Sequence, residues 1–175
     1  MSRSVYIISG PAGVGKSTTS RKLVAHLDRS SYISGDDISH LPVNGRGKPW
    51  ICQETHKLTW INILSLVKNL IQFNYDVVID YVTFPSEANW LASELESLNV
   101  RIIYVVFMVD DETIIRRDQL RDPSVQMGER SLILLNEFRE VLKDDRHILN
   151  TQEYSVDQVD EVIEEILNND RFLIS

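Results

Sequence analysis

The chain has 175 residues, of which 43% are hydrophobic and 25% are charged, and these proportions fit one globular domain rather than a disordered or fibrous chain. Its net charge of -8 argues against a long nucleic acid as partner, because affinity for a phosphate backbone comes from clustered lysines and arginines. The single cysteine, Cys52, excludes an internal disulfide and fits a reducing compartment. No secretory signal is visible, and the longest apolar run, from Ile102 to Val109, is far shorter than the roughly 20 residues that cross a bilayer. We therefore expect a cytoplasmic protein that does not bind membranes.

Apolar runs of strand length alternate with amphipathic helical patterns along the whole chain. The strands are predicted at residues 5–9, 32–33, 76–81, 101–109 and 147–149. The helices are predicted at residues 16–27, 54–73, 85–98, 111–121, 128–142 and 156–167. This alternation predicts an α/β fold of three layers, in which helices cover both faces of a parallel sheet and the connections are right-handed. Ligands of such sheets bind outside the carboxyl ends of the strands.

The stretch from Gly10 to Thr18 matches the phosphate-loop pattern G-x-x-x-x-G-K-[ST] in full. It stands between the first strand and the first helix, which is the context that the motif requires. Glycines allow backbone N–H groups to wrap a phosphate chain, and the helix that opens at Lys16 points its positive dipole end at the anion. We expect Lys16 to reach the β- and γ-phosphates of a nucleotide and Ser17 to bind Mg²⁺. The predicted nucleotide-binding residues in this loop are Gly10, Ala12, Gly13, Val14, Gly15, Lys16, Ser17 and Thr18.

Three carboxylates are predicted near the phosphate loop. Asp36 and Asp37 follow the second strand, where a carboxylate can accept the proton of an acceptor hydroxyl and orient its oxygen. Asp36, which is closer to the strand, is the first candidate for this base, although the sequence does not decide between the two. Asp80 ends the third strand as a Walker B carboxylate does, and it is predicted to hold Mg²⁺ together with Ser17. The alternatives are a Gly-Asp-Asp turn and a carboxylate that caps a loop.

An arginine-rich helix and the breaker-containing stretch after it predict a lid over residues 116–130. Arg117 and Arg121 stand four residues apart and therefore share a helix face. We expect both to contact the triphosphate, where they would neutralise the charge that develops during transfer, with Arg117 also binding the nucleotide. The alternative is that arginines near the end of a helix only complement its dipole.

The irregular stretch between residues 38 and 49 and the residues beside it predict a substrate-facing loop. His40, Arg46 and Trp50 provide polar groups and one aromatic wall, and with Asp36 and Asp37 they are the predicted contacts of a small acceptor. Each of the loop residues can instead belong to an ordinary surface.

Taken together, these motifs resemble the small-molecule kinase branch of P-loop proteins, which includes nucleoside monophosphate, shikimate and gluconate kinases and chloramphenicol phosphotransferase. The likeness covers the whole chain and is strongest to gluconate-kinase-like proteins at Gly35, Asp36, His40, Asn44, Gly47 and Trp50. It implies a P-loop NTPase fold with a five-stranded parallel sheet, ATP and Mg²⁺ as cofactors, and transfer of a phosphoryl group to a hydroxyl. After Asn44 the sequence departs from the gluconate-kinase pattern, since residues 48–53 replace its acidic-acidic-Arg run.

Three functions follow from these residues. The first is a kinase, formed by one domain over residues 1–175, whose acceptor is a sugar acid, a nucleoside or an antibiotic-like molecule. The second is a regulatory NTPase without an acceptor, although the guanine-reading Asn-Lys-x-Asp motif is absent and Tyr81 replaces the glutamate of motor ATPases. The third is a 5′-end polynucleotide kinase, which the acidic charge disfavours. The acceptor, the choice between ATP and GTP, and the oligomeric state stay open.

Overall fold

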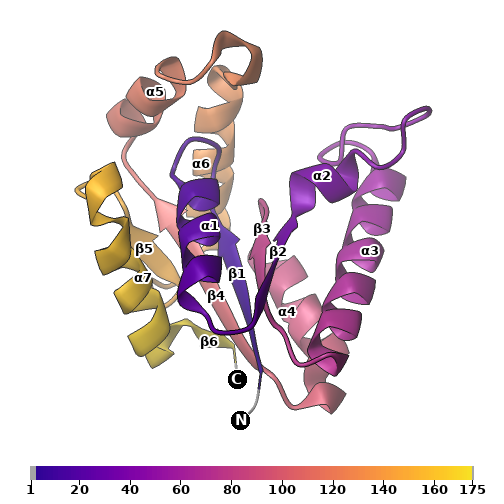
Figure 1. Ribbon diagram of the computed structural model, residues 1–175. Coiled ribbons are helices and arrows are strands. Elements are labelled where there is room, and N and C mark those ends of the chain that lie inside the picture. Colours follow the sequence, from indigo (N-terminus) through magenta and orange to yellow (C-terminus); the bar gives the residue numbers. More distant parts are fainter. Residues whose placement is uncertain (1–2, 175) are drawn as a thin grey trace.

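The computed structural model describes residues 3–174, apart from the side chain of Val156. Its described strands form a single sheet in the order β2-β3-β1-β4-β5, in which all five strands are parallel, and a sixth strand pairs with β4 in the antiparallel direction (Figure 1). The strands are β1 (Ser4–Ser9), β2 (Ser30–Ser34), β3 (Asp76–Asp80), β4 (Arg101–Met108), β5 (Ile148–Asn150) and β6 (Leu173–Ile174). The predicted five-stranded parallel sheet is confirmed.

Helices connect these strands and cover both faces of the sheet. They are α1 (Lys16–His26), α2 (Gly35–Ser39), α3 (Gln53–Gln72), α4 (Pro85–Leu95), α5 (Asp111–Gln119), α6 (Glu129–Val141) and α7 (Val159–Asn168). Short 3-10 turns are described at Glu96–Leu98, Pro123–Val125, Val156–Gln158 and Asp170–Phe172. Helices α1 and α7 pack against each other in front of the sheet, and α4 and α6 lie behind it (Figure 1). No described helix is both long enough and apolar enough to span a bilayer.

The central strands are buried on both faces, as the unbroken apolar runs of the sequence predict. Every residue of β1 is buried, and β4 is buried after its first residue. The register places Ile8 of β1 opposite Asp80 of β3, and Ser34 of β2 opposite the same aspartate. The carboxyl ends of β1, β2 and β3 therefore meet at one edge of the sheet. At this edge, the upper end in Figure 1, the phosphate loop lies between α2 on one side and α5 and α6 on the other.

Two elements differ from the prediction. The chain turns into the short helix α2 immediately after Ser34, where we expected a strand end followed by irregular chain, so Asp36 and Asp37 lie in its first turn. The Ser34 hydroxyl caps this helix by accepting a hydrogen bond of 3.2 Å from the Asp37 backbone. Gly35 is required at this junction, since an added Cβ would stand 2.1 Å from the Cγ atom of Tyr81. The second element, β6, has only two residues and carries no detectable sequence pattern.

Candidate functional site

A cleft of about 960 Å³ opens at the carboxyl edge of the sheet. Its walls are the phosphate loop, α2 with the loop after it, the segment between β3 and α4, and the segment that joins α5 to α6. Most of the predicted site residues line it: Ala12, Gly13, Gly15, Lys16, Ser17, Thr18, Asp36, His40, Arg46, Trp50, Asp80, Arg117 and Arg121. Residues far apart in the sequence are thus brought to one cavity.

Three predicted residues do not line this cleft. Gly10 and Val14 belong to the frame of the phosphate loop, since Val14 is buried and Gly10 packs on β4. A Cβ added to Gly10, whose φ is +129°, would stand 2.4 Å from the carbonyl oxygen of Phe107. Asp37 is exposed on α2, outside the cleft lining, whereas its neighbour Asp36 is part of that lining. Of the two aspartates, the cleft is therefore lined by Asp36, which was the first candidate from the sequence.

The phosphate loop has the shape of an anion cradle. Gly13 and Gly15 both have positive φ values, of 86° and 98°, and an added Cβ at Gly15 would meet no atom within 4 Å. Gly15 is also the N-cap of α1, and no side chain caps this helix. The N–H groups of its first turn and its positive dipole end therefore face the cleft, an arrangement that suits a phosphate.

Lys16 stands inside this loop. Its Nζ atom donates a hydrogen bond of 2.7 Å to the carbonyl oxygen of Pro11. Burial lowers the pKa of Lys16, while the carboxylates of Asp80 and Asp36 act in the opposite direction. The ammonium group thus lies close to the two carboxylates and at the base of the anion cradle.

Asp80 and Ser17 provide oxygen ligands that suit Mg²⁺. The Asp80 side chain is buried, with 7% of the residue exposed, and its Oδ2 atom accepts a hydrogen bond of 2.7 Å from the Tyr32 hydroxyl. Burial, reinforced by this contact with Asp80, raises the pKa of Tyr32, so the tyrosine remains a donor. The described residues contain no cluster of three or more His, Cys, Asp or Glu side chains that could hold a metal ion. Mg²⁺ fits such a site because it keeps water ligands and draws others from substrate phosphates.

Asp36 faces the cleft from α2. Although its side chain remains accessible to solvent within the cleft, the surrounding protein desolvates its carboxyl and raises its pKa, while Lys16 opposes this shift. The side chain of Tyr81 is nearby, and burial together with the charge of Asp36 raises the pKa of Tyr81 to about 12. A carboxylate whose pKa is raised is a stronger proton acceptor once it is ionised.

Arg117 binds backbone carbonyls of two segments that are far apart in the sequence. It donates to the carbonyl oxygens of Thr151 at 2.8 Å, Val14 at 3.4 Å and Tyr154 at 3.4 Å. Burial lowers the pKa of this guanidinium, and the neighbouring Arg116 adds to the effect. Arg117 therefore ties α5 to the phosphate loop and to the chain that follows β5. Arg116 is exposed and is not part of the cleft lining.

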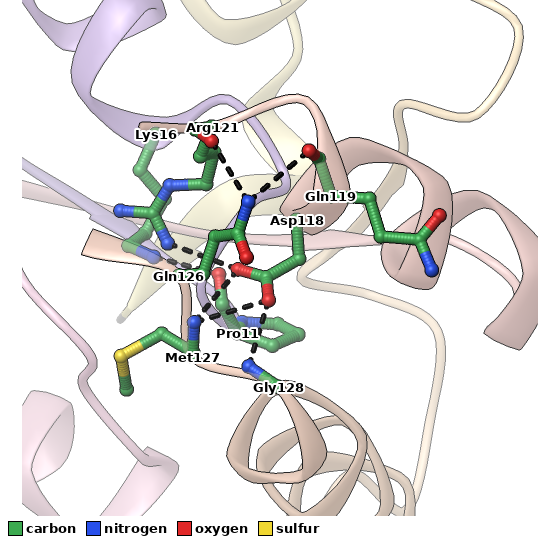
Figure 2. A network of polar contacts seen from close by, with 8 residues as sticks. All are labelled: Pro11, Lys16, Asp118, Gln119, Arg121, Gln126, Met127 and Gly128. Atoms are coloured by element: carbon green, nitrogen blue, oxygen red, sulfur yellow. Dashed lines mark hydrogen bonds and ion pairs between the residues drawn. The ribbon is translucent and has the colours of Figure 1, made fainter. Parts of the chain in front are cut away.

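Asp118 organises the 118–128 loop, which begins in the last turn of α5 and ends just before α6 (Figure 2). Its carboxylate accepts hydrogen bonds from the backbone N–H of Met127 at 3.0 Å and of Gly128 at 2.7 Å, and it pairs with Arg121 at 3.3 Å. Burial alone would raise the pKa of Asp118, but these bonds outweigh it and the pKa is lowered. The Nε2 atom of Gln126 closes the same loop by donating hydrogen bonds to the carbonyl oxygens of Gln119 and Arg121. Sequence reasoning missed Asp118, because an aspartate near a helix end is usually exposed.

The far half of the cleft, away from the phosphate loop, is bounded by the loop after α2. Arg46 donates from Nε to the carbonyl oxygen of Ser39 at 2.6 Å, and His40 Nδ1 lies 2.6 Å from the carbonyl oxygen of Asp36. Trp50, which is 52% exposed, lies under two cations, with Lys48 Nζ 5.6 Å and Arg130 Cζ 5.5 Å from its ring centroid.

Two carboxylates in the far half were missed by sequence reasoning. Glu137 pairs with Arg130 through two contacts, at 3.0 and 3.4 Å, and both residues come from α6. Glu87 pairs with His56 at 3.4 Å and accepts a hydrogen bond from the backbone N–H of Phe84 at the start of α4. In the sequence, both glutamates look like members of a solvated helix face.

The fold and the phosphate loop together define a P-loop protein of the three-layer α/β type. The chain belongs to the AAA domain family, whose model matches residues 5–143. No curated protein matches the sequence.

Solved structures with the same fold include small kinases. A sugar kinase from Janibacter sp. HTCC2649 superposes with a TM-score of 0.70 at 16% identity, covering 96% of this chain and 95% of that one. A gluconokinase from Sinorhizobium meliloti 1021 gives 0.67 at 17% identity, over 94% and 89% of the two chains. The APS kinase of Mycobacterium tuberculosis in complex with AMPPNP and APS gives 0.62 at 17% identity, over 96% and 98%. The fold expected from the resemblance to small P-loop kinases is therefore confirmed.

Proposed function

We propose that this protein is a P-loop phosphotransferase that moves the γ-phosphoryl group of Mg-ATP to a hydroxyl of a small acceptor. The observation that carries the proposal is the arrangement of one cleft, which is lined by the phosphate loop and Lys16 at one end and continues past Asp36 into a chamber bounded by Trp50. A nucleotide-binding switch needs the first part but not the second. The kinases with this fold support the same assignment.

The nucleotide half of the cleft would hold the polyphosphate. Three cations, Lys16, Arg117 and Arg121, line this half beside one carboxylate, Asp80, so it carries a positive charge that suits an anionic ligand. The uncapped first turn of α1 and the glycines of the loop supply N–H groups to the phosphates. Mg²⁺, held by Ser17 and Asp80, would neutralise charge on the phosphate oxygens.

Asp36 would act as the base. Its carboxyl faces the cleft near Lys16, so an acceptor hydroxyl bound beside it would lie next to the γ-phosphate. The carboxylate would accept the hydroxyl proton as the oxygen attacks phosphorus in line with the leaving oxygen. The 118–128 loop would serve as a lid that presents Arg121 to the transferring group and excludes water.

Transfer of labelled phosphate from ATP to a panel of sugars, sugar acids, nucleosides and antibiotics tests this proposal. We expect transfer to at least one compound well above background hydrolysis, complete loss of transfer in Lys16→Ala, and strong loss in Asp36→Asn with nucleotide binding retained. Asp37→Asn is the matched control, since Asp37 is exposed outside the cleft lining, and it should retain most of the transfer.

Three other outcomes would contradict the assigned base, the small acceptor or the substrate class. If Asp36→Asn transferred phosphate at the wild-type rate, Asp36 would not be the base. Slow hydrolysis with no acceptor across the panel would favour the regulatory NTPase, and transfer only to oligonucleotides with 5′-hydroxyl ends would favour a polynucleotide kinase.

A further inference from the structure

We infer that the acceptor is an uncharged molecule that carries a planar apolar ring beside its reactive hydroxyl. The inference rests on the proposed function and names the substrate class of the same cleft. Its basis is a difference in charge and polarity between the two halves of the cavity.

Fixed charges balance in the acceptor half. The cations Arg46, Lys48 and Arg130 line it together with the carboxylates Glu87 and Glu137, and Asp36 adds a third negative charge at the border with the nucleotide half. The nucleotide half, by contrast, has three cations and one carboxylate. An acceptor that carries a carboxylate or phosphate would therefore be attracted to the phosphate loop, but it would gain no net electrostatic attraction in the acceptor half.

Two of the three cations of the acceptor half also bind protein partners. Arg130 donates from Nη1 and Nη2 to the Glu137 carboxylate, at 3.0 and 3.4 Å, which occupies one edge of its guanidinium, while its buried Nε atom has no partner among the described residues. Arg46 donates two hydrogen bonds to Ser39, one to the carbonyl oxygen and one at 3.2 Å to the hydroxyl. Recognition of an anionic acceptor requires donors that are available, and among these three cations only the Lys48 side chain has no hydrogen bond or ion pair within the described residues.

Much of the wall that remains is apolar and aromatic. Trp50 lines the chamber from the loop between α2 and α3, Tyr81 and Phe84 line it from the segment between β3 and α4, and Met127 and Leu134 line it from the side of α6. Phe84 is held in place by stacking on Phe138, with ring centroids 4.4 Å apart. Aromatic walls on several sides favour a flat ring, which gains contact area at low entropic cost, over a fully hydroxylated sugar.

His40 adds a polar contact for a neutral acceptor. Its Nδ1 atom lies 2.6 Å from the carbonyl oxygen of Asp36, and because a carbonyl oxygen only accepts, Nδ1 carries the proton. In the neutral ring, Nε2 is then an acceptor, and His40 lines the chamber. A hydroxyl or N–H group of the acceptor can donate to this nitrogen of the neutral ring.

The test compares phosphate transfer from Mg-ATP to pairs of acceptors that differ in charge. The neutral 2-phenyl-1,3-propanediol is set against 3-hydroxy-2-phenylpropanoate, in which a carboxylate replaces one hydroxymethyl group, and against gluconate. We expect kcat/KM for a neutral ring-bearing acceptor to exceed that of its charged counterpart by at least tenfold. In Glu137→Gln, which leaves Arg130 unpaired, this preference should fall by about tenfold, while Glu140→Gln, at an exposed position on the same helix, should leave it unchanged.

Preference for gluconate or for 3-hydroxy-2-phenylpropanoate would overturn the inference while leaving the phosphotransferase itself intact. Binding of Mg-AMPPNP without transfer to any neutral ring-bearing compound would also overturn it. Failure to bind Mg-AMPPNP at all would overturn the proposed function, and the inference with it, so the two failures are distinguishable.

Discussion

Replacement of Asp118 by alanine should release the 118–128 loop without unfolding the sheet. The carboxylate, whose side chain is 7% exposed, holds the backbone N–H groups of Met127 and Gly128 at 3.0 and 2.7 Å. A hydrogen bond to a charged acceptor contributes about 1.5–3 kcal/mol. Because Gly128 is exposed and water can replace part of the loss, we take the lower figure for each bond, about 3 kcal/mol in total. That energy corresponds to about a 150-fold change in the opening equilibrium of the loop.

Amide hydrogen exchange measures this opening directly. In Asp118→Ala, the protection of the Met127 and Gly128 amides should fall by about 150-fold, the factor that corresponds to the energy above. Asp118→Asn keeps one neutral acceptor and should give an intermediate loss. Asp122→Ala is the matched control within the same loop, because Asp122 caps only the local turn at Ser124 and is exposed. Unchanged protection at Met127 and Gly128 in Asp118→Ala would refute the assignment of Asp118 as the organiser of the loop.

Three further predictions follow from the same contacts. In Arg117→Lys, the lysine cannot span the carbonyl oxygens of Val14, Thr151 and Tyr154, so the KM for ATP should rise about tenfold in steady-state kinetics. The control Arg116→Lys, at an exposed position, should leave this KM unchanged. Equal effects of the two substitutions would contradict the role of Arg117 in holding α5 to the phosphate loop. Gly35→Ala places a Cβ 2.1 Å from Tyr81 and should lower the free energy of unfolding in urea by about 2–3 kcal/mol, and a loss below about 0.5 kcal/mol would count against this packing. The lowered pKa of Asp118 means that its ionised form stabilises the loop, so this stabilisation is complete above about pH 4, the ordinary aspartate pKa, and is lost as the pH falls through the lowered folded value. An NMR titration of the Met127 amide should show its main transition below pH 4, and a transition near neutral pH would be inconsistent with this.

The sheet and the nucleotide half of the cleft could be predicted from the sequence because their signals are local. Unbroken apolar runs at β1 and β4 mark strands that are buried on both faces, and the pattern from Gly10 to Thr18 is contiguous. Asp80 was found as a strand-end carboxylate, since the carboxyl ends of parallel strands meet at one edge.

The parts that could not be predicted depend on pairing between distant residues or on weak local patterns. Asp118 is buried only because Met127 and Gly128 fold back onto it. The pairing of Arg130 with Glu137, seven residues apart on α6, has no distinct signal in a helix that carries other charges. The helix α2 has five residues, too few for a periodic pattern, so a strand end followed by irregular chain was expected there.

The role of Arg117 shows a similar limit. Its spacing from Arg121 predicts a shared helix face, and both residues do line the cleft. The sequence gives no indication that Arg117 donates to three backbone carbonyls, since those acceptors come from other segments of the chain. Arg121, which pairs with Asp118, is therefore the better candidate for contact with the transferring phosphate.

Calorimetric titration of the protein with Mg-AMPPNP tests the central claim most directly. We predict saturable binding of one nucleotide per chain, loss of that binding in Lys16→Ala, and binding within threefold of wild type in Asp36→Asn. An absence of binding heat in the wild-type protein across temperatures, or equal binding by Lys16→Ala, would contradict the assignment of residues 10–18 as the cradle of the polyphosphate.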